Sequence, residues 1–184
     1  GVQQSFGVTP NESSGQIFRY TPSEYVGTTY EVEPDASSAS YPLAAAAIVG
    51  GRVVLSGLGR SSLQGDSRFV DVLVRMGCAV EYVGDDVALT RPAEQPLMGV
   101  TVDMRDMSDL VPTLAVVASF AQTATTITGV AFIRNKESDR IGDLAHELRQ
   151  LGVSVEEAHD GLTVHPSTTH AGVIDTHHDH RLAM

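Results

Sequence analysis

The chain of 184 residues has one cysteine, no tryptophan and one lysine. The single cysteine, Cys78, excludes an internal disulfide and a zinc site built from several thiolates. Because it lies between Gly77 and Ala79, we expect a small buried residue, and its isolation fits a reducing compartment such as the cytoplasm. No apolar stretch approaches the roughly 20 residues that a membrane-spanning helix needs, so the sequence predicts no membrane partner.

Positive charge is also scarce. Lysine and arginine together number 12 against 23 acidic residues, which gives a formal net charge of −11. Nucleic acids and anionic membranes are bound by basic surfaces, so this balance argues against both as partners. If the ligand is an anion, the few cations have to converge on it. The sequence indicates no cofactor, because Gly57-Leu58-Gly59 lacks the third glycine and the lysine of nucleotide-binding loops.

The single lysine, Lys136, lies in residues 134–140, where three cations and two acids occupy seven positions. A lysine ammonium is a compact charge whose pKa shifts readily, whereas an arginine guanidinium stays protonated. An ammonium beside Glu137 in a chain that otherwise uses arginine therefore suggests a chemical role. A solvated charge cluster at the start of a helix is the alternative interpretation.

An internal repeat with an offset of about 75 residues organises the chain. Residues 73–81 resemble residues 148–156, and residues 32–57 resemble residues 102–129. Each copy has the pattern of a strand, an alanine-rich helix, a strand, a second helix and a hairpin, which predicts an α/β fold of repeated βαβαββ units.

The repeat sets the expected domain organisation. The two copies span about residues 32–92 and 100–166, and residues 1–31 are expected to be the tail of a preceding lobe. Residues 171–184 resemble the start of a third copy, with a strand at residues 173–175 and a helix that begins at His180.

The second helix of the later copy carries an apolar stripe and ends at Gly152, a typical C-terminal cap. The earlier copy repeats this pattern and ends at Gly77. The stripe consists of Ile141, Leu144, Ala145, Leu148 and Leu151.

The turns before the first helix of each copy are rich in Asp and Ser. Ser37, Ser38 and Asp106 are predicted to cap helices, since exposed N–H groups at a helix start attract polar and acidic side chains. Arg140 and Arg181 are cations at helix starts, where a cation is disfavoured, so they suggest a bound carboxylate or phosphate. Pairing of these arginines with Asp139 or Asp179 is the alternative.

The run His177-His178-Asp179-His180 could suggest a metal site. Neighbouring residues point to different sides of the chain, and no second set of ligands at helical spacing accompanies them. We therefore predict no metal.

Three segments, residues 35–41, 136–140 and 179–184, together resemble the 5-enolpyruvylshikimate-3-phosphate (EPSP) synthase family, the 3-phosphoshikimate 1-carboxyvinyltransferases. The resemblance covers essentially the whole chain. It implies the inside-out α/β barrel of that family, here incomplete, and transfer of the enolpyruvyl group of phosphoenolpyruvate to shikimate 3-phosphate without a cofactor. The other expected partners are the remaining segments of the same enzyme.

The resemblance also implies roles for particular residues. Catalytic roles are implied for Glu137, which would serve the C3 carbon of phosphoenolpyruvate, and for Asp109 and Lys136, beside the shikimate hydroxyl group. Substrate binding is implied for Asp109, Lys136, Arg140, His180 and Arg181, with the two arginines at the phosphoenolpyruvate carboxylate.

One position departs from the resemblance, since Phe132 replaces an asparagine found in some members, and Asn135 directly precedes the lysine. This places one contact to the shikimate phosphate in doubt. An isolated piece of this length is expected to be inactive. Two alternatives remain open: an enzyme resembling UDP-N-acetylglucosamine 1-carboxyvinyltransferase, and a noncatalytic repeat module that binds anions.

Overall fold

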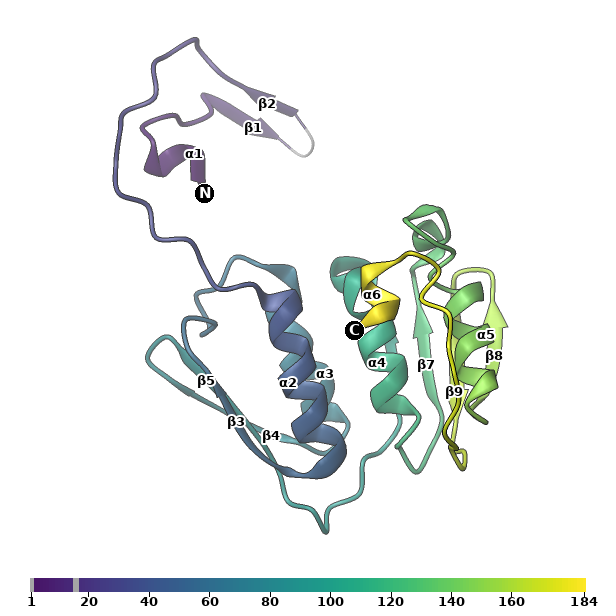
Figure 1. The fold of residues 1–184 in the computed structure, drawn as a ribbon. Helices are drawn as coiled ribbons and strands as arrows, with labels where there is room; N and C mark the ends of the chain where they lie inside the picture. The colour runs from purple at the N-terminus through teal and green to yellow at the C-terminus, as the bar shows by residue number, and fades with distance from the viewer. Residues whose placement is uncertain (1, 15–16) are drawn as a thin grey trace. The chain divides into compact units, whose positions relative to one another are not determined.

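The computed structural model describes residues 2–14 and 17–184, and the chain divides into a small unit that ends at Glu33 and a larger unit, Pro34–Met184 (Figure 1). The small unit contains helix α1 (Val2–Ser5) and the antiparallel strands β1 (Glu12–Ser14) and β2 (Ile17–Arg19). Residues 20–33 form neither helix nor strand. The prediction of a strand at Val32 is therefore wrong. Val32 is 77% exposed, and an extended segment with no buried face gains little stability from pairing with another strand.

The larger unit begins with the first copy of the repeat. Its elements are α2 (Ala36–Val49), β3 (Gly51–Leu55), the 3-10 helix η1 (Gly65–Arg68), α3 (Phe69–Arg75), β4 (Ala79–Val83) and β5 (Asp86–Arg91). The three strands form an antiparallel sheet in the order β3-β5-β4. Both predicted helices and the predicted hairpin are confirmed.

The second copy follows with a strand before its first helix. Its elements are β6 (Thr101–Asp103), η2 (Arg105–Leu110), α4 (Val111–Ala118), β7 (Thr125–Thr128), η3 (Ala131–Asn135), α5 (Gly142–Gln150), β8 (Ser154–Ala158) and β9 (Gly161–His165). The sheet order is β6-β7-β9-β8, and β6 and β7 are parallel. In the sequence, helix α4 follows β6 and precedes β7, so it forms the crossover connection that two parallel strands need. This arrangement confirms the α/β class.

Glycine ends the second helix of each copy, as predicted. Gly152 follows α5 with a φ of +85°, and the N–H group of Val153 donates to the carbonyl oxygen of Leu148 at 3.0 Å. Gly77 follows α3 with a φ of +111°. Glycine adopts these left-handed conformations without the steric cost of a Cβ atom, and the chain can turn directly into the hairpin.

The core lies where the helices pack on the sheets and on one another, and α2 and α4 lie side by side (Figure 1). Cys78 is buried, as expected, and burial raises the pKa of its thiol. Four members of the predicted α5 stripe are buried: Ile141, Leu144, Ala145 and Leu148. No helix in the described part of the chain combines the length and the hydropathy that crossing a membrane requires.

The end of the chain differs from the prediction. Residues 166–179 form neither helix nor strand, so the strand expected at residues 173–175 is wrong. Val173 is 93% exposed, and the N–H group of Asp175 donates to Glu147 of α5 at 3.1 Å instead of to a neighbouring strand. The helix expected from His180 is confirmed as α6 (His180–Ala183).

Candidate functional site

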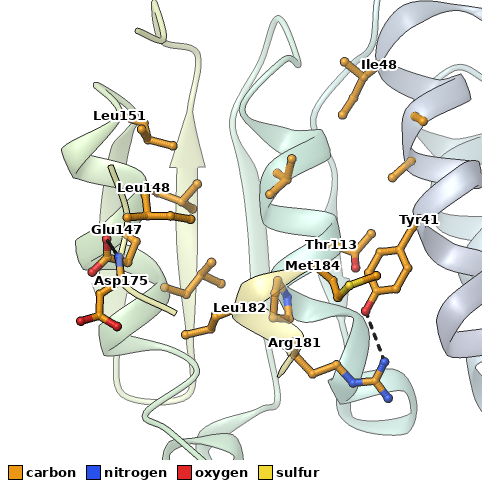
Figure 2. Close-up of a pocket in the computed structure, with 16 residues that line it drawn as sticks. Tyr41, Ile48, Thr113, Glu147, Leu148, Leu151, Asp175, Arg181, Leu182 and Met184 are labelled. Carbon is orange, nitrogen blue, oxygen red and sulfur yellow. Dashed lines mark hydrogen bonds between the residues drawn. The ribbon is translucent and has the colours of Figure 1, made fainter. Parts of the chain in front are cut away.

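A mostly apolar cavity of about 290 Å³ lies within the larger unit among α2, α4, α5 and the end of the chain (Figure 2). Ile48, Leu148 and Leu182 contribute to its apolar wall. Arg181 also lines it, and its Nη1 atom lies 3.5 Å from the hydroxyl oxygen of Tyr41. Arg181 therefore joins the cavity to the polar cluster described next.

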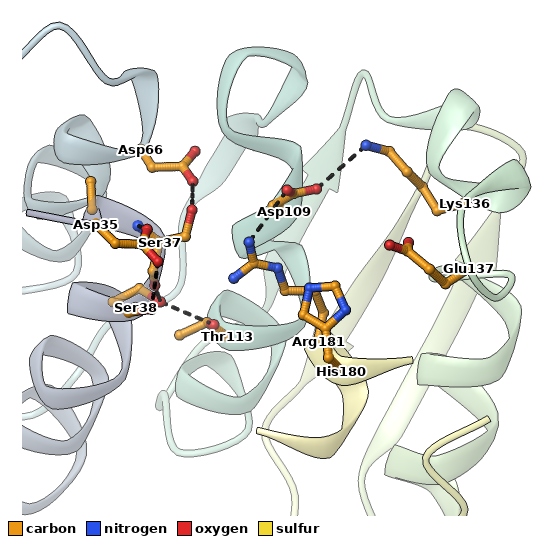
Figure 3. Close-up of polar contacts among 12 residues, drawn as sticks. Asp35, Ser37, Ser38, Asp66, Asp109, Thr113, Lys136, Glu137, His180 and Arg181 are labelled. Atoms are coloured by element: carbon orange, nitrogen blue, oxygen red, sulfur yellow. Dashed lines mark hydrogen bonds and ion pairs between the residues drawn. The ribbon is translucent and has the colours of Figure 1, made fainter. Parts of the chain in front are cut away.

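Asp109 is the centre of a cluster of charged side chains (Figure 3). It lies in η2, and three cations approach its carboxylate. Nη1 of Arg140 donates to Oδ1 at 2.9 Å, Nζ of Lys136 lies 3.5 Å from Oδ1, and Nη2 of Arg181 lies 3.5 Å from Oδ2. Asp109 in η2, the loop that follows η3 and the start of α6 thus bring the predicted residues to one place.

Arg140 forms the buried base of this cluster, since the residue is 1% exposed. Besides its bond to Asp109, it donates from Nη2 to Oε2 of Glu137 at 2.6 Å and from Nε to Oδ2 of Asp179 at 2.6 Å. Burial alone would lower the pKa of Arg140, but the three carboxylates raise it. The buried guanidinium is therefore charged and fully paired.

Asp179 is the buried partner of Arg140, at 1% exposure. It accepts from the hydroxyl group of Ser138 at 3.0 Å and, as the cap of α6, from the N–H group of Arg181 at 2.8 Å. Burial would raise the pKa of Asp179, but the hydrogen bonds from Arg140, Arg181 and Ser138 outweigh burial and lower it to about 2. The carboxylate stays ionised and fixes the start of α6.

The loop that carries Lys136 is fixed by Asp139 and Arg134. Asp139 accepts from the N–H groups of Ile141 at 3.1 Å and Gly142 at 2.9 Å, so it caps the chain that enters α5. Arg134 donates to Asp139 at 2.8 Å and to the carbonyl oxygen of His159 at 3.1 Å, in the β8–β9 turn. No separate role was predicted for Arg134, although it lies in the same charge-dense segment.

Three of the predicted residues form an accessible rim. The side chains of Lys136 and Glu137 are 36% and 49% exposed. The side chain of His180 is 62% exposed, and its Nδ1 atom lies 3.9 Å from Asp179. A ligand can reach these groups, whereas Arg140 and Asp179 lie beneath them.

In Figure 3 the start of α2 lies on one side of Arg181, and Lys136 and Glu137 lie on the other. The start of α2 has its own polar contacts. Asp35 accepts from the N–H group of Ser37 at 2.9 Å and from the hydroxyl group of Ser38 at 2.6 Å, so Asp35 is the N-terminal cap of α2. The capping role predicted for Ser37 and Ser38 is wrong, because both residues lie inside the helix. The Ser38 hydroxyl group is the main reason that the pKa of Asp35 is lowered. The capping role predicted for Asp106 is wrong, because its side chain pairs with Arg68 at 3.3 Å.

Two other sequence features are placed by the structure. Phe132 lies in η3 with 48% of its surface exposed, just before the loop that carries Lys136. Among residues 2–14 and 17–184, no group of three His, Cys, Asp or Glu side chains is arranged to hold a metal ion.

Comparison with solved structures defines the class of protein. The chain is similar to EPSP synthase from Acinetobacter baumannii, with a TM-score of 0.79 and 27% identity over 98% of this chain and 44% of that chain. It also has the fold of the enolpyruvyl transferase NikO from Streptomyces tendae, with a TM-score of 0.65 and 23% identity over 91% of this chain and 39% of that chain. The chain therefore has the α/β fold of the enolpyruvyl transferases.

Sequence comparison then defines the family. The chain belongs to the EPSP synthase (3-phosphoshikimate 1-carboxyvinyltransferase) family, whose pattern matches residues 2–184. It is 45% identical over 183 residues to the 3-phosphoshikimate 1-carboxyvinyltransferase of Methanosphaerula palustris, covering 100% of this chain and 43% of that protein. The corresponding protein of Methanoculleus marisnigri is 48% identical over 160 residues, 87% of this chain and 37% of its own length. The chain spans less than half the length of these relatives.

Proposed function

We propose that the protein containing this chain transfers the enolpyruvyl group of phosphoenolpyruvate to the 5-hydroxyl group of shikimate 3-phosphate, with release of phosphate, in the cytoplasm. The observation that carries this proposal is the convergence of Lys136, Arg140 and Arg181 on the carboxylate of Asp109. The three cations lie in the segments through which the sequence resembles the family, residues 136–140 and 179–184. The remaining segments of the enzyme would complete the site.

The reaction needs an acid and a base, and it needs cations that hold two anions. The hydroxyl oxygen forms a bond to C2 of phosphoenolpyruvate while C3 takes up a proton and the double bond becomes single. The bond between C2 and the phosphate oxygen then breaks. Phosphate leaves with the electron pair of that bond, C3 returns its proton, and the double bond forms again.

The side chains of the cluster fit these steps. Glu137 is the group proposed to exchange the proton with C3, because its carboxylate lies on the accessible rim. Asp109 is proposed to hold and deprotonate the attacking hydroxyl group, with the Lys136 ammonium beside it. Arg181, Arg140 and His180 are proposed to bind the carboxylate of phosphoenolpyruvate.

Arg140 is 1% exposed, and four of its five N–H groups already donate to carboxylates of the protein, so a bidentate contact with a substrate carboxylate requires it to exchange a partner. The Asp179 side chain is fully buried, whereas that of Glu137 is half exposed. We therefore propose that the substrate carboxylate replaces Glu137 on Arg140. The exchange would release the Glu137 carboxyl group at the moment when a substrate carbon arrives beside it.

Substitution Glu137→Gln in the complete enzyme tests this assignment. We expect kcat to fall by about 10²-fold or more, the usual contribution of an acid–base group, while the affinity for shikimate 3-phosphate changes little. The matched control is Glu81→Gln, which removes a carboxylate paired with an exposed arginine, Arg52, at 2.9 Å in the first copy. Unchanged turnover in the Glu137 variant would reject its proposed role.

A further inference from the structure

The segment that leads into the site contains an unfavourable turn. His177 and His178, just before Asp179, have φ values of +51° and +56°. Residues other than glycine rarely adopt this left-handed conformation, because the Cβ atom approaches the following carbonyl oxygen. Such a turn persists only where its surroundings hold it.

Glu147 of α5 holds this turn. The residue is 8% exposed, and its two carboxylate oxygens bind two points of the segment. Oε2 accepts from the N–H group of Asp175 at 3.1 Å, and Oε1 lies 2.8 Å from Nε2 of His177. Two bonds close the turn itself: the N–H group of His177 donates to Oδ1 of Asp175 at 2.7 Å, and that of Asp179 donates to the carbonyl oxygen of Thr176 at 2.8 Å.

The turn determines where Asp179 lies. Asp179 follows His178 directly, and its buried carboxylate binds Arg140 and the N–H group of Arg181. If the turn relaxed, Asp179 would move away from Arg140 and the start of α6 would lose its cap. Nothing in the chemistry assigned to the site uses Glu147 or His177 directly.

We propose that Glu147 and His177 are positioning residues: together they form a latch that keeps the left-handed turn in place and thereby holds Asp179 and Arg181 in the substrate site. The effect of the latch on substrate binding rests on the proposed function. Its effect on the contact between Asp179 and Arg140 does not.

The charges around the latch make it sensitive to pH. His177 faces Glu147, Asp143, with Nδ1 3.8 Å from Oδ1, and Asp175, while His146 acts on Glu147. The hydrogen bond to Glu147 is the main reason that the pKa of His177 is raised above 6.5. A raised pKa in the folded protein means that the ion pair is complete below pH 6.5 and is lost as the pH rises through the folded value.

The test uses the complete protein and the Nε–H resonance of Arg140, which donates to Asp179. In the Glu147→Ala variant we expect this proton to exchange with water at least about tenfold faster, because its bonding partner is no longer held. Binding of shikimate 3-phosphate with phosphoenolpyruvate should weaken by about tenfold as well. If this variant does not fold, His177→Ala breaks the same latch from the other side.

A second substitution at His178 distinguishes a positioning role of Glu147 and His177 from a role in packing. Adding His178→Gly to either variant should slow the exchange and tighten the binding again by about threefold or more, because glycine removes the strain at one of the two left-handed positions. Adding His178→Ala should not, and it serves as the matched control at this exposed position. Unchanged exchange without the latch, or a loss that glycine does not rescue, would overturn the proposal. If the wild-type protein bound neither substrate, the proposed function would fail, while the Arg140 proton would still test the latch.

Discussion

The two copies of the repeat have the same helices and hairpins but use their charged residues differently. In the first copy, Arg68 ends η1 and pairs with Asp106 at 3.3 Å, and both side chains are more than half exposed. In the second copy, Arg140 occupies the corresponding stretch before the second helix, and its side chain is 2% exposed among three carboxylates. The fold is thus shared, whereas the buried charge cluster lies in one set of loops.

Burial explains why this difference matters. An exposed ion pair is screened by water and contributes little to stability. A buried arginine is tolerated only while its carboxylate partners are present, because an unpaired buried charge is very costly. The second copy therefore places stability and the proposed ligand binding on the same groups.

The largest expected effect comes from Asp179→Ala, which removes the buried partner of Arg140. We expect the free energy of unfolding to fall by about 3–5 kcal/mol, as for other broken buried pairs. The control is Arg68→Ala in the first copy, where the loss should stay below about 1 kcal/mol. Urea unfolding measures both values, and similar losses in the two variants would remove the distinction between the copies.

A smaller effect is expected from Asp35→Ala at the start of α2. Loss of this cap should cost about 1 kcal/mol at neutral pH. The folded pKa of Asp35 is lowered below 3.8, so its contribution is present above that pH and is lost as the pH falls through the lower folded value. Urea unfolding of both proteins at several pH values measures this. A difference that persisted unchanged into strong acid would contradict the capping role.

The helices and hairpins were predictable because their signals are local. The apolar stripe of α5 and the glycines at 77 and 152 determine helix ends whatever surrounds them. The strands expected at Val32 and at residues 173–175 were wrong because a β-rich segment needs a partner strand and a buried face. Neither requirement can be read from the segment itself.

The residues of the candidate site follow from the family resemblance, but their contacts could not be predicted from the sequence. Family resemblance selected Asp109, Lys136 and Glu137, but the burial of Asp179 depends on packing between segments far apart in the sequence. Glu147 was missed, although a signal existed: this acid stands three residues after Leu144, on the apolar side of α5, where a charged residue needs a partner.

The charged groups around Asp109 are proposed to form one substrate site. A crystal structure of the complete protein with shikimate 3-phosphate and phosphoenolpyruvate bound would show where both substrates lie. We predict that the phosphoenolpyruvate carboxylate lies on Arg140 and Arg181, with Glu137 released from Arg140 and Asp179 still in place. Both ligands bound elsewhere, with Glu137 still paired to Arg140, would rule out this substrate site.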